Sequence, residues 1–391
     1  MINTNYNSSF PDQVVPESEK ATLEYGLAVG RAIENEWFKN DRGVYDRFNT
    51  NYNNFHRLRL YARGEQSVQK YKDELSINGD LSYLNLDWKP VPVVPKFVDI
   101  LVNGISQRNY ELKAYSQDPT SVSKRTKYAE SILEDINAAK YIEAVKAATG
   151  KDVSRGPKGK NVPTQPEDIE AHMQFDYKQS IEVAQEEAIN YILEKNKYDL
   201  TRRRLNYDLT VLGIACTKTN FNESEGVKVE YVDPANLVYS YTEDPYFDDL
   251  YYVGEVKAIS LPELVKQFPK LTSEDIKELQ KYNGSQQNTR AFGSKYDNQT
   301  VQVLYFDYKT YTNQVFKIKK KDNGFEKALE KQDTFLEAED NDNFKKAHRS
   351  IEVLYSGAKV LGTQKMLSWK MSENMTRPEA DIAKVNMNYS L

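Results

Sequence analysis

The sequence predicts an α+β fold, because two kinds of hydrophobic periodicity follow one another along its 391 residues. Apolar residues recur at intervals of three and four through much of the first half, which is the spacing of an amphipathic helix. Apolar and polar residues alternate in the last third, which is the spacing of a half-buried strand. Turn residues at 222–226 join two β-prone runs and predict a hairpin. The length favours two or three domains.

Composition limits the classes of function. The chain carries 53 Lys and Arg against 58 Asp and Glu, whereas a protein that coats DNA needs clustered basic residues in excess. Its single cysteine, Cys216, excludes an internal disulfide and a cysteine-rich zinc site. We find neither a secretory leader nor a run of about eighteen apolar residues, so we expect no membrane association. The 28 tyrosines suit half-buried surfaces and interfaces.

The N-terminal third predicts an irregular arm followed by helices. Residues 1–17 are polar and aperiodic, and a helix begins near Ser18. A second helix is expected over 51–63, where several basic residues gather. A solvated face is the ordinary interpretation of such a helix, and contact with nucleic acid or an acidic neighbour is the alternative. Pro95 begins an apolar helix, and residues 109–115 alternate like a strand.

Residues 150–166 form the clearest flexible insert. The glycines of this basic segment lack the spacing of a phosphate-binding loop, so a surface loop is expected. Residues 121–149 before it are helical in character. Pro166 then opens a long helix whose apolar residues fall every three or four positions as far as Ile192. Such a stripe forms a core or an inter-subunit contact.

The most informative stretch is 198–271, where several signals follow in one order. An amphipathic helix ends at Gly213, a residue suited to a helix C-terminus. The hairpin at 222–226 comes next. An acidic loop, 243–249, then leads into a strand and a short helix over 261–268, with proline in its first turn.

The C-terminal third predicts a small β unit after one more helix. That helix has a capping start at Thr272 or Ser273, and a polar loop follows over 283–298. The last strand region is expected to be a hairpin that turns at Ser356–Gly357. The expected strands are 301–311, 313–319 and 350–362, with a charged insert at 319–349.

This order of elements resembles the wing of tailed-phage portal proteins. In that family a long helix ends in glycine, and a hairpin, a V-x-P-x-N element, an acid-rich D-P loop, a strand and an S-x-x-E-L-x-x-x-F-P helix follow. The Tyr- and Asn-rich composition looks most like the portals of crAss-like phages. The matching residues here are Val232, Pro234, Asn236, Asp244, Pro245, Ser260, Glu263, Leu264, Phe268 and Pro269.

The resemblance implies a domain order. It implies a helix-rich wing with small β-sheets over 1–271, a short stem helix and loop over 272–299, and a β-rich clip over 300–375. Residues 376–391 would begin a return helix, so that the remainder of a portal would be missing. Portal proteins also commonly have a proline-led apolar helix early in the wing, as at Pro95.

The resemblance also implies an assembly. A dodecameric ring at one capsid vertex would conduct double-stranded DNA during packaging and ejection, after forming in the host cytoplasm. Its partners would be the major capsid protein, the terminase motor and the head-to-tail connector. No enzyme activity, cofactor or metal is implied. A mildly acidic chain suits a conduit, since weakly attractive walls let the duplex slide.

Basic residues of the clip region are candidates for contact with an acidic partner. A solvated charged rim is the alternative interpretation. These residues are Lys317, Lys319, Lys320, Lys321 and Arg349.

Two other functions stay open. One is a metal-dependent DNA-processing enzyme that uses Glu243, Asp244, Asp248 and Asp249, although a solvated acidic loop is the expected structure. The other is a different structural protein, such as a head-tail adaptor.

Catalytic groups are scarce. None of His56, His172 and His348 belongs to an HExxH pair suited to zinc. Cys216 lies in an apolar strand, where cysteine is usually an inert small hydrophobe.

Overall fold

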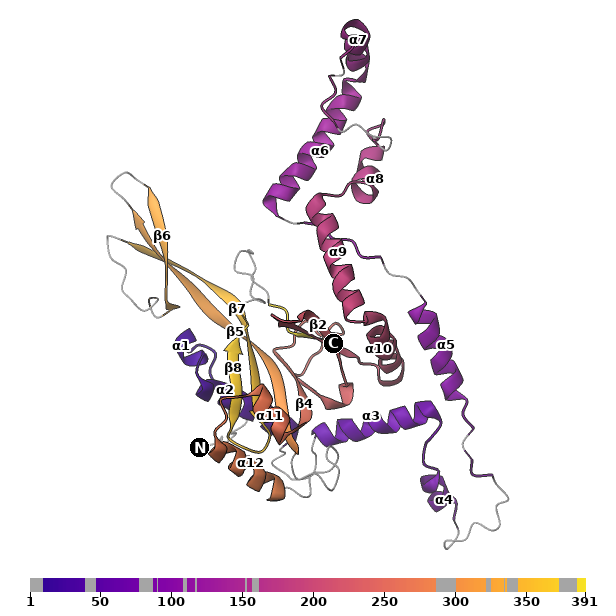
Figure 1. Ribbon diagram of the computed structural model, residues 1–391, viewed down its shortest axis with the longest axis vertical. Helices are drawn as coiled ribbons and strands as arrows, with labels where there is room; N and C mark the ends of the chain where they lie inside the picture. The colour runs from indigo at the N-terminus through magenta and orange to yellow at the C-terminus, as the bar shows by residue number, and fades with distance from the viewer. Residues whose placement is uncertain are drawn as a thin grey trace. The chain divides into compact units, whose positions relative to one another are not determined.

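The computed structural model has helices and antiparallel sheets in separate parts of the chain, which confirms the α+β fold (Figure 1). The residues that it describes are 10–38, 47–76, 87–89, 91–107, 111–116, 118–151, 153–156, 162–285, 300–320, 325–333, 335, 344–372 and 385–391.

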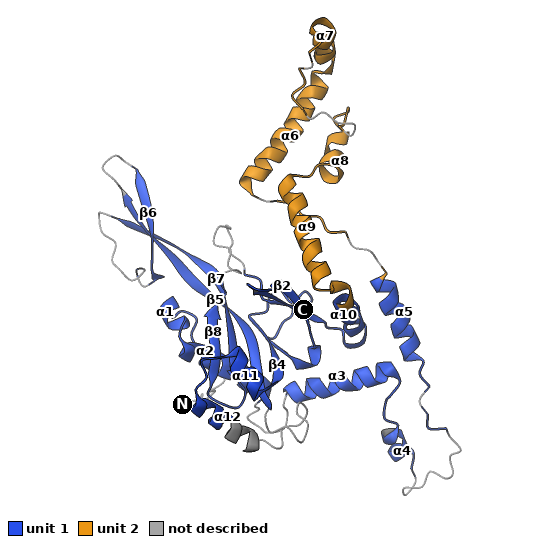
Figure 2. Ribbon diagram, viewed as in Figure 1, with its two compact units in different colours: residues 1–106, 201–391 blue, residues 107–200 orange. Residues whose placement is uncertain are grey.

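The chain folds into two compact units, which Figure 2 distinguishes by colour. Unit 1 comprises Met1–Ser106 and Thr201–Leu391, and unit 2 comprises Gln107–Leu200. This division differs from the expected separation of residues 1–271 from residues 300–375. The reason is that strands from both of these ranges pair in one sheet of unit 1.

That sheet has six antiparallel strands in the order β3-β4-β5-β7-β8, with β6 paired to the outer part of β5. β5 pairs with β4 from Tyr252↔Tyr308 to Ser260↔Thr300, and it pairs with β7 from Val303↔Val360 to Ile318↔Lys345. The strands are β3 (Leu237–Tyr239), β4 (Tyr252–Ser260), β5 (Thr300–Lys320), β6 (Glu326–Lys331), β7 (Lys345–Val360) and β8 (Met366–Met371).

Long continuous strands replace several expected turns. β5 is one strand of 21 residues, where two strands were expected. The expected hairpin at Ser356–Gly357 is wrong, because both residues lie inside β7, and the chain turns back only between Val360 and β8. Described residues of the charged insert 319–349 lie largely in β5, β6 and β7, so that they extend the sheet.

A second, three-stranded sheet has the order β2-β1-β9. It contains the predicted hairpin, in which Gly226 takes a positive φ of 78° that favours glycine. Within the expected return helix, residues 385–391 form no helix. They carry β9, which pairs with β1 at Thr217↔Ser390, and residues 373–384 lie outside the described part. The strands are β1 (Cys216–Asn222), β2 (Gly226–Val232) and β9 (Tyr389–Ser390).

Helices cover both faces of the six-stranded sheet. Alternate residues of β5 such as Phe306 and Tyr308 face α2 (Leu23–Phe38), whose Trp37 is 1% exposed. Residues of the other face, such as Val303, contact α11 (Leu261–Gln267) and α12 (Ser273–Ser285). Each buried large apolar side chain contributes roughly 1.5–3 kcal/mol. The expected stem helix, α12, therefore packs on this sheet through its buried Leu279.

The remaining helices of unit 1 are short or carry one buried stripe. α3, α5 and α10 meet in a small cluster that includes Ala62 and Val98. α10 ends where the sequence predicts, with Gly213 at φ 78°. Asp233 accepts a hydrogen bond from the Ala235 amide and begins the 3-10 turn η1 (Pro234–Asn236). These helices are α1 (Glu17–Lys20), α3 (Arg47–Arg63), α4 (Gln69–Leu75), α5 (Val94–Ser106) and α10 (Tyr198–Leu212).

Unit 2 is helical, and one buried carboxylate connects segments that are distant in the sequence. Glu182 accepts hydrogen bonds from the Ser116 and Gln179 amides at 3.0 Å and pairs with Arg125. The single long helix expected from Pro166 is therefore broken before α9. Described residues 111–116 form no strand, contrary to expectation. The helices are α6 (Pro119–Asn137), α7 (Ala139–Thr149), α8 (Asp168–Phe175) and α9 (Ser180–Lys195).

The described part of the expected insert 150–166 lies within unit 2 and contacts α6. The Arg155 and Gly156 amides donate to the carboxylate of Asp135 on α6, at 3.0 and 2.7 Å. Residues 152 and 157–161 lie outside the described part.

Candidate functional site

The predicted basic interface falls on an arm of the large sheet. We define the arm as residues 313–320 of β5, all of β6, and residues 345–350 of β7, which pair with one another. Figure 1 shows these strands extending beyond the part of the sheet that α2 and α11 cover. The arm exposes every residue of β6. It is thus a three-stranded ribbon without the helical cover of the inner sheet.

The arm brings together some of the predicted basic residues and separates others. Lys317 and Lys319 are two positions apart on β5, so their side chains lie on the same face. Arg349 pairs with Gln314, donates to its side chain at 2.8 Å, and lies on the opposite face. Lys320 ends β5, and Lys321 lies outside the described residues.

Lys317 is held by two aromatic rings. Its ammonium lies 3.9 Å from the ring centroid of Phe344 and 5.2 Å from that of Phe335. Cation–π contacts of this kind are worth roughly 0.5–1 kcal/mol at exposed sites. Lys317 is therefore positioned within the ribbon and does not sample solvent freely.

The acidic loop uses its carboxylates to bind its own backbone. Asp244 accepts hydrogen bonds from the Tyr246 and Asp248 amides at 3.0 and 3.1 Å. Asp249 accepts from the Thr242 hydroxyl and from the Glu243 amide, and these bonds lower the pKa of Asp249. Within the described part of the chain, no three His, Cys, Asp or Glu side chains converge as a metal site would require.

One arginine of the basic helix α3 forms ion pairs inside unit 1. Arg59 donates to both carboxylate oxygens of Asp233, at 2.7 and 3.0 Å, and to Asp208 at 3.1 Å. Tyr231 also donates to Asp208. Burial alone would raise the pKa of Asp233, but the hydrogen bonds from Arg59 and the Ala235 amide lower it below its ordinary value. Arg59 therefore braces the turn that begins at Asp233.

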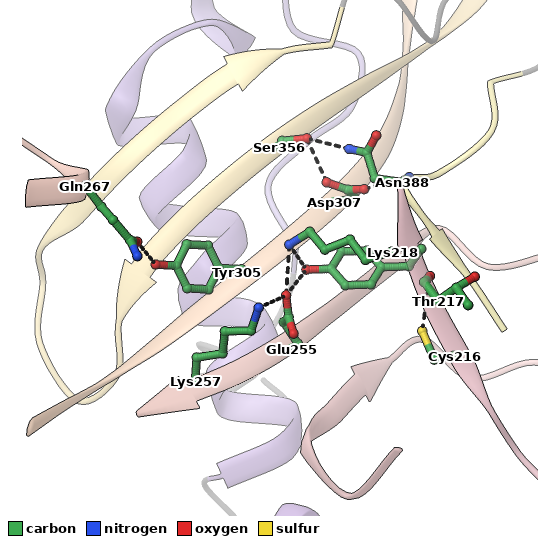
Figure 3. A network of polar contacts seen from close by, with 11 residues as sticks. Cys216, Thr217, Lys218, Glu255, Lys257, Gln267, Tyr305, Asp307, Ser356 and Asn388 are labelled. Atoms are coloured by element: carbon green, nitrogen blue, oxygen red, sulfur yellow. Dashed lines mark hydrogen bonds and ion pairs between the residues drawn. The ribbon is translucent and has the colours of Figure 1, made fainter. Parts of the chain in front are cut away.

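A polar network that sequence reasoning missed joins the two sheets (Figure 3). Lys218 of β1 donates to Glu255 of β4 at 2.9 Å and to the Tyr389 hydroxyl at 2.7 Å. Lys257 also pairs with Glu255, at 3.0 Å. The sequence shows charged residues inside two strands, Lys218 in β1 and Glu255 and Lys257 in β4, but it does not reveal that they pair.

The buried Asp307 belongs to the same region. It accepts hydrogen bonds from the Ser356 hydroxyl at 2.7 Å and from the Asn388 amide at 2.9 Å. Burial raises the pKa of Asp307, and the hydrogen bonds oppose that effect only in part. The hydrogen bond between Asn388 and Asp307 holds the segment that carries β9 against β5.

A pocket of about 170 Å³ opens beside this network, between Tyr305, Asp307 and Asn388. Pockets that bind small molecules usually have a volume of roughly 300–1,000 Å³. A water molecule occupies roughly 30 Å³ of liquid, so this space suits a few waters. The network therefore has a structural role in connecting the sheets.

The histidines and the cysteine do not form a catalytic group. His56 lies on α3 beside Tyr52, His172 is buried on α8 near Tyr128, and His348 lies on the arm. Burial raises the pKa of the Cys216 thiol, which makes it a poor nucleophile at neutral pH.

Comparison of the sequence with models of known protein families and with curated protein sequences gave no match. Among the described residues, no helix combines the length and hydropathy needed to cross a lipid bilayer.

Proposed function

We propose that the chain is a portal subunit of a tailed phage, which forms a ring at one capsid vertex and conducts double-stranded DNA. The order of elements supports this proposal. α10, the β1–β2 hairpin, η1, β3, the acidic loop, β4 and α11 follow one another as the resemblance implies. Of the motif residues, Pro234 and Asn236 lie in η1, and Ser260 directly precedes α11.

The observation that carries the assembly part of the proposal is the apolar outer face of α5. Phe97, Ile100 and Leu101 are 62%, 67% and 54% exposed and share one side of the helix. Val98 and Val102, on another side, are buried in the cluster with α3 and α10. Monomers rarely leave contiguous apolar patches of this kind uncovered, so a neighbouring subunit is the natural cover.

Unit 2 considered by itself shows the same feature. Ile181, Ala184 and Ala188 of α9, which belong to the predicted apolar stripe, are exposed, Ile181 by 46%. The sequence predicts an apolar stripe here that serves a core or an inter-subunit contact. Its exposure in a single chain supports the second of these uses.

In this proposal the arm belongs to the clip. It would face the terminase motor during packaging and the head-to-tail connector afterwards. The major capsid protein would contact the outside of the ring, and the DNA would pass along its axis. No cofactor or metal takes part.

Mass photometry of the purified chain, with negative-stain images of the assembled species, tests the proposal. We expect closed rings with a central opening and near twelve-fold symmetry. A chain that remains monomeric across the micromolar range would contradict it.

A paired substitution on α5 tests which surface closes the ring. Ile100→Glu places a charge in the apolar outer face and should shift most of the mass to monomer, because the carboxylate would be buried unpaired. Asp99→Asn changes one charge on the polar side of the same helix and should leave the rings intact. Equal effects of the two variants would exclude this face from the contact.

A further inference from the structure

The strand register sorts the charges of the arm onto two different faces. Residues directly opposite in an antiparallel sheet point to the same side, as do alternate residues of one strand. Lys317 pairs with Lys346 of β7, and Lys319 pairs with Lys327 of β6. The face that these residues define, which we call the basic face, carries Lys317, Lys319, Lys327, Lys331, Lys346 and His348, with the uncharged Asn313, Val315, Leu329 and Ser350.

No carboxylate occupies a register position on the basic face. The arm's two strand glutamates, Glu326 and Glu330, pair with Lys320 and Phe316 and therefore lie on the other side. Lys345 and Arg349 lie on that side as well. The side opposite the basic face thus carries both positive and negative residues, whereas the charged residues on the basic face are all positive.

This arrangement works against the stability of the arm. Like charges directly opposite each other in a sheet are destabilising, by amounts comparable to the roughly 0.2–1 kcal/mol of a favourable pair. Lys319, Lys327 and Lys331 are exposed, and among the residues that the structure describes none pairs with a carboxylate. The chain has more carboxylates than basic groups, so the basic face is a local segregation of charge.

We propose that the basic face binds the phosphate backbone of double-stranded DNA. A phosphodiester backbone is a partner of uniform negative charge, which a face without carboxylates fits. Alternate lysines of a strand lie roughly 6.6–6.8 Å apart, so a row of them can contact successive phosphates.

The kind of residue indicates the kind of contact. Lysine acts on phosphate as a point charge, whereas arginine and the amides make the paired hydrogen bonds that read bases. The basic face has lysines and no arginine or glutamine at its strand positions, and its one asparagine, Asn313, accepts a hydrogen bond from Ser350. The contact should therefore be insensitive to DNA sequence. This inference rests on the register of the arm and holds whether or not the chain forms a ring.

The test measures binding of a fluorescein-labelled duplex of mixed sequence to the full chain, by anisotropy over a salt titration. The triple variant Lys319→Gln/Lys327→Gln/Lys331→Gln should lose at least about tenfold in affinity near 0.1 M salt. The slope of log affinity against log salt should fall by about 2 to 3, since each phosphate contact contributes about 0.9.

A charge-matched control separates this face from net charge. Lys345→Gln/Arg349→Gln/Lys370→Gln removes three positive charges elsewhere, two on the other side of the arm and one on β8. It should keep affinity within about twofold. Equal losses in both triple variants, or no loss in either, would overturn the proposal. All six positions are exposed, and far-UV circular dichroism checks the fold of each variant.

A competition measurement distinguishes DNA from an acidic protein as the partner of the basic face. If poly-glutamate displaces the duplex equally well at equal charge concentration, an acidic protein is the better partner, and the proposal fails. If the unaltered chain does not bind the duplex, the proposal is overturned.

Discussion

Lysine side chains have opposite environments in the inner and outer halves of β5 and β7. In the inner half, Lys359 is fully buried and its ammonium donates to Glu34 of α2. In the outer half, Lys319 faces Lys327 across the ribbon and no described carboxylate pairs with either. A buried lysine in these strands needs a carboxylate partner, whereas exposed lysines at the outer end can lie beside one another because water solvates them. A repulsion that the fold does not need indicates a binding surface.

The largest expected effect comes from the buried pair. Glu34→Ala removes the carboxylate that serves both Lys359 and the Gly362 amide, which donates to it at 2.7 Å. Removing one partner of a buried ion pair costs about 3–5 kcal/mol. Urea unfolding followed by circular dichroism should show this loss.

Two controls show whether the loss comes from the buried charge. Glu24→Ala, exposed on the same helix, should change stability by less than about 0.5 kcal/mol. Glu34→Gln combined with Lys359→Met should lose less than Glu34→Ala alone, because no charge then remains buried. A double variant as unstable as the single one would show that shape, and not charge, dominates there.

Arg59 offers a smaller effect at the edge of the core. Arg59→Ala takes the guanidinium from Asp233 and Asp208, and a hydrogen bond to a charged group is worth about 1.5–3 kcal/mol. We expect a loss of about 2–3 kcal/mol in the free energy of unfolding. Arg57→Ala, exposed on the same helix, is the control, and a similar loss there would refute a specific role for Arg59.

The raised pKa of Asp307 predicts that the stability of the chain depends on pH. Burial raises the pKa of Asp307 in the folded state. Its contribution to the free energy of unfolding is therefore complete below the pKa that it has in the unfolded chain, near 3.8, and is lost as the pH rises through the folded-state pKa. Asp307→Asn does not titrate. The stability of the original chain relative to this variant should therefore fall as the pH rises above about 4, and a constant difference would mean that Asp307 has the same pKa in the folded and unfolded states.

The sequence predicts local elements well wherever their signals lie close together. The C-terminus of α10 at Gly213 and the β1–β2 hairpin follow from a helix-ending glycine and a turn. The break before α9 was missed because it depends on Glu182, whose side chain binds the distant Ser116 amide. The pairing of β4 with β5 was missed for the same reason, since residues some fifty positions apart meet only through tertiary packing.

The candidate site shows the same limit. Lys317 and Lys319 could be selected from the sequence because they are neighbours on one strand. Lys327 and Lys331 could not be added, because only the register of β6 against β5 places them on the same face. Arg349 was selected with the lysines, yet the register of β7 assigns it to the opposite side.

The smallest predicted effect has the opposite sign to the first. Lys319→Gln removes the repulsion with Lys327 and should stabilise the chain by a few tenths of a kcal/mol, whereas a change at Lys359 in the core destabilises it. Thermal unfolding at low salt measures the difference, which should shrink at about 1 M salt as screening removes the repulsion. Added duplex DNA should reverse the order of the two melting temperatures, because it stabilises the form that binds it more tightly. A variant that is less stable without DNA would show that Lys319 already has a partner within the chain.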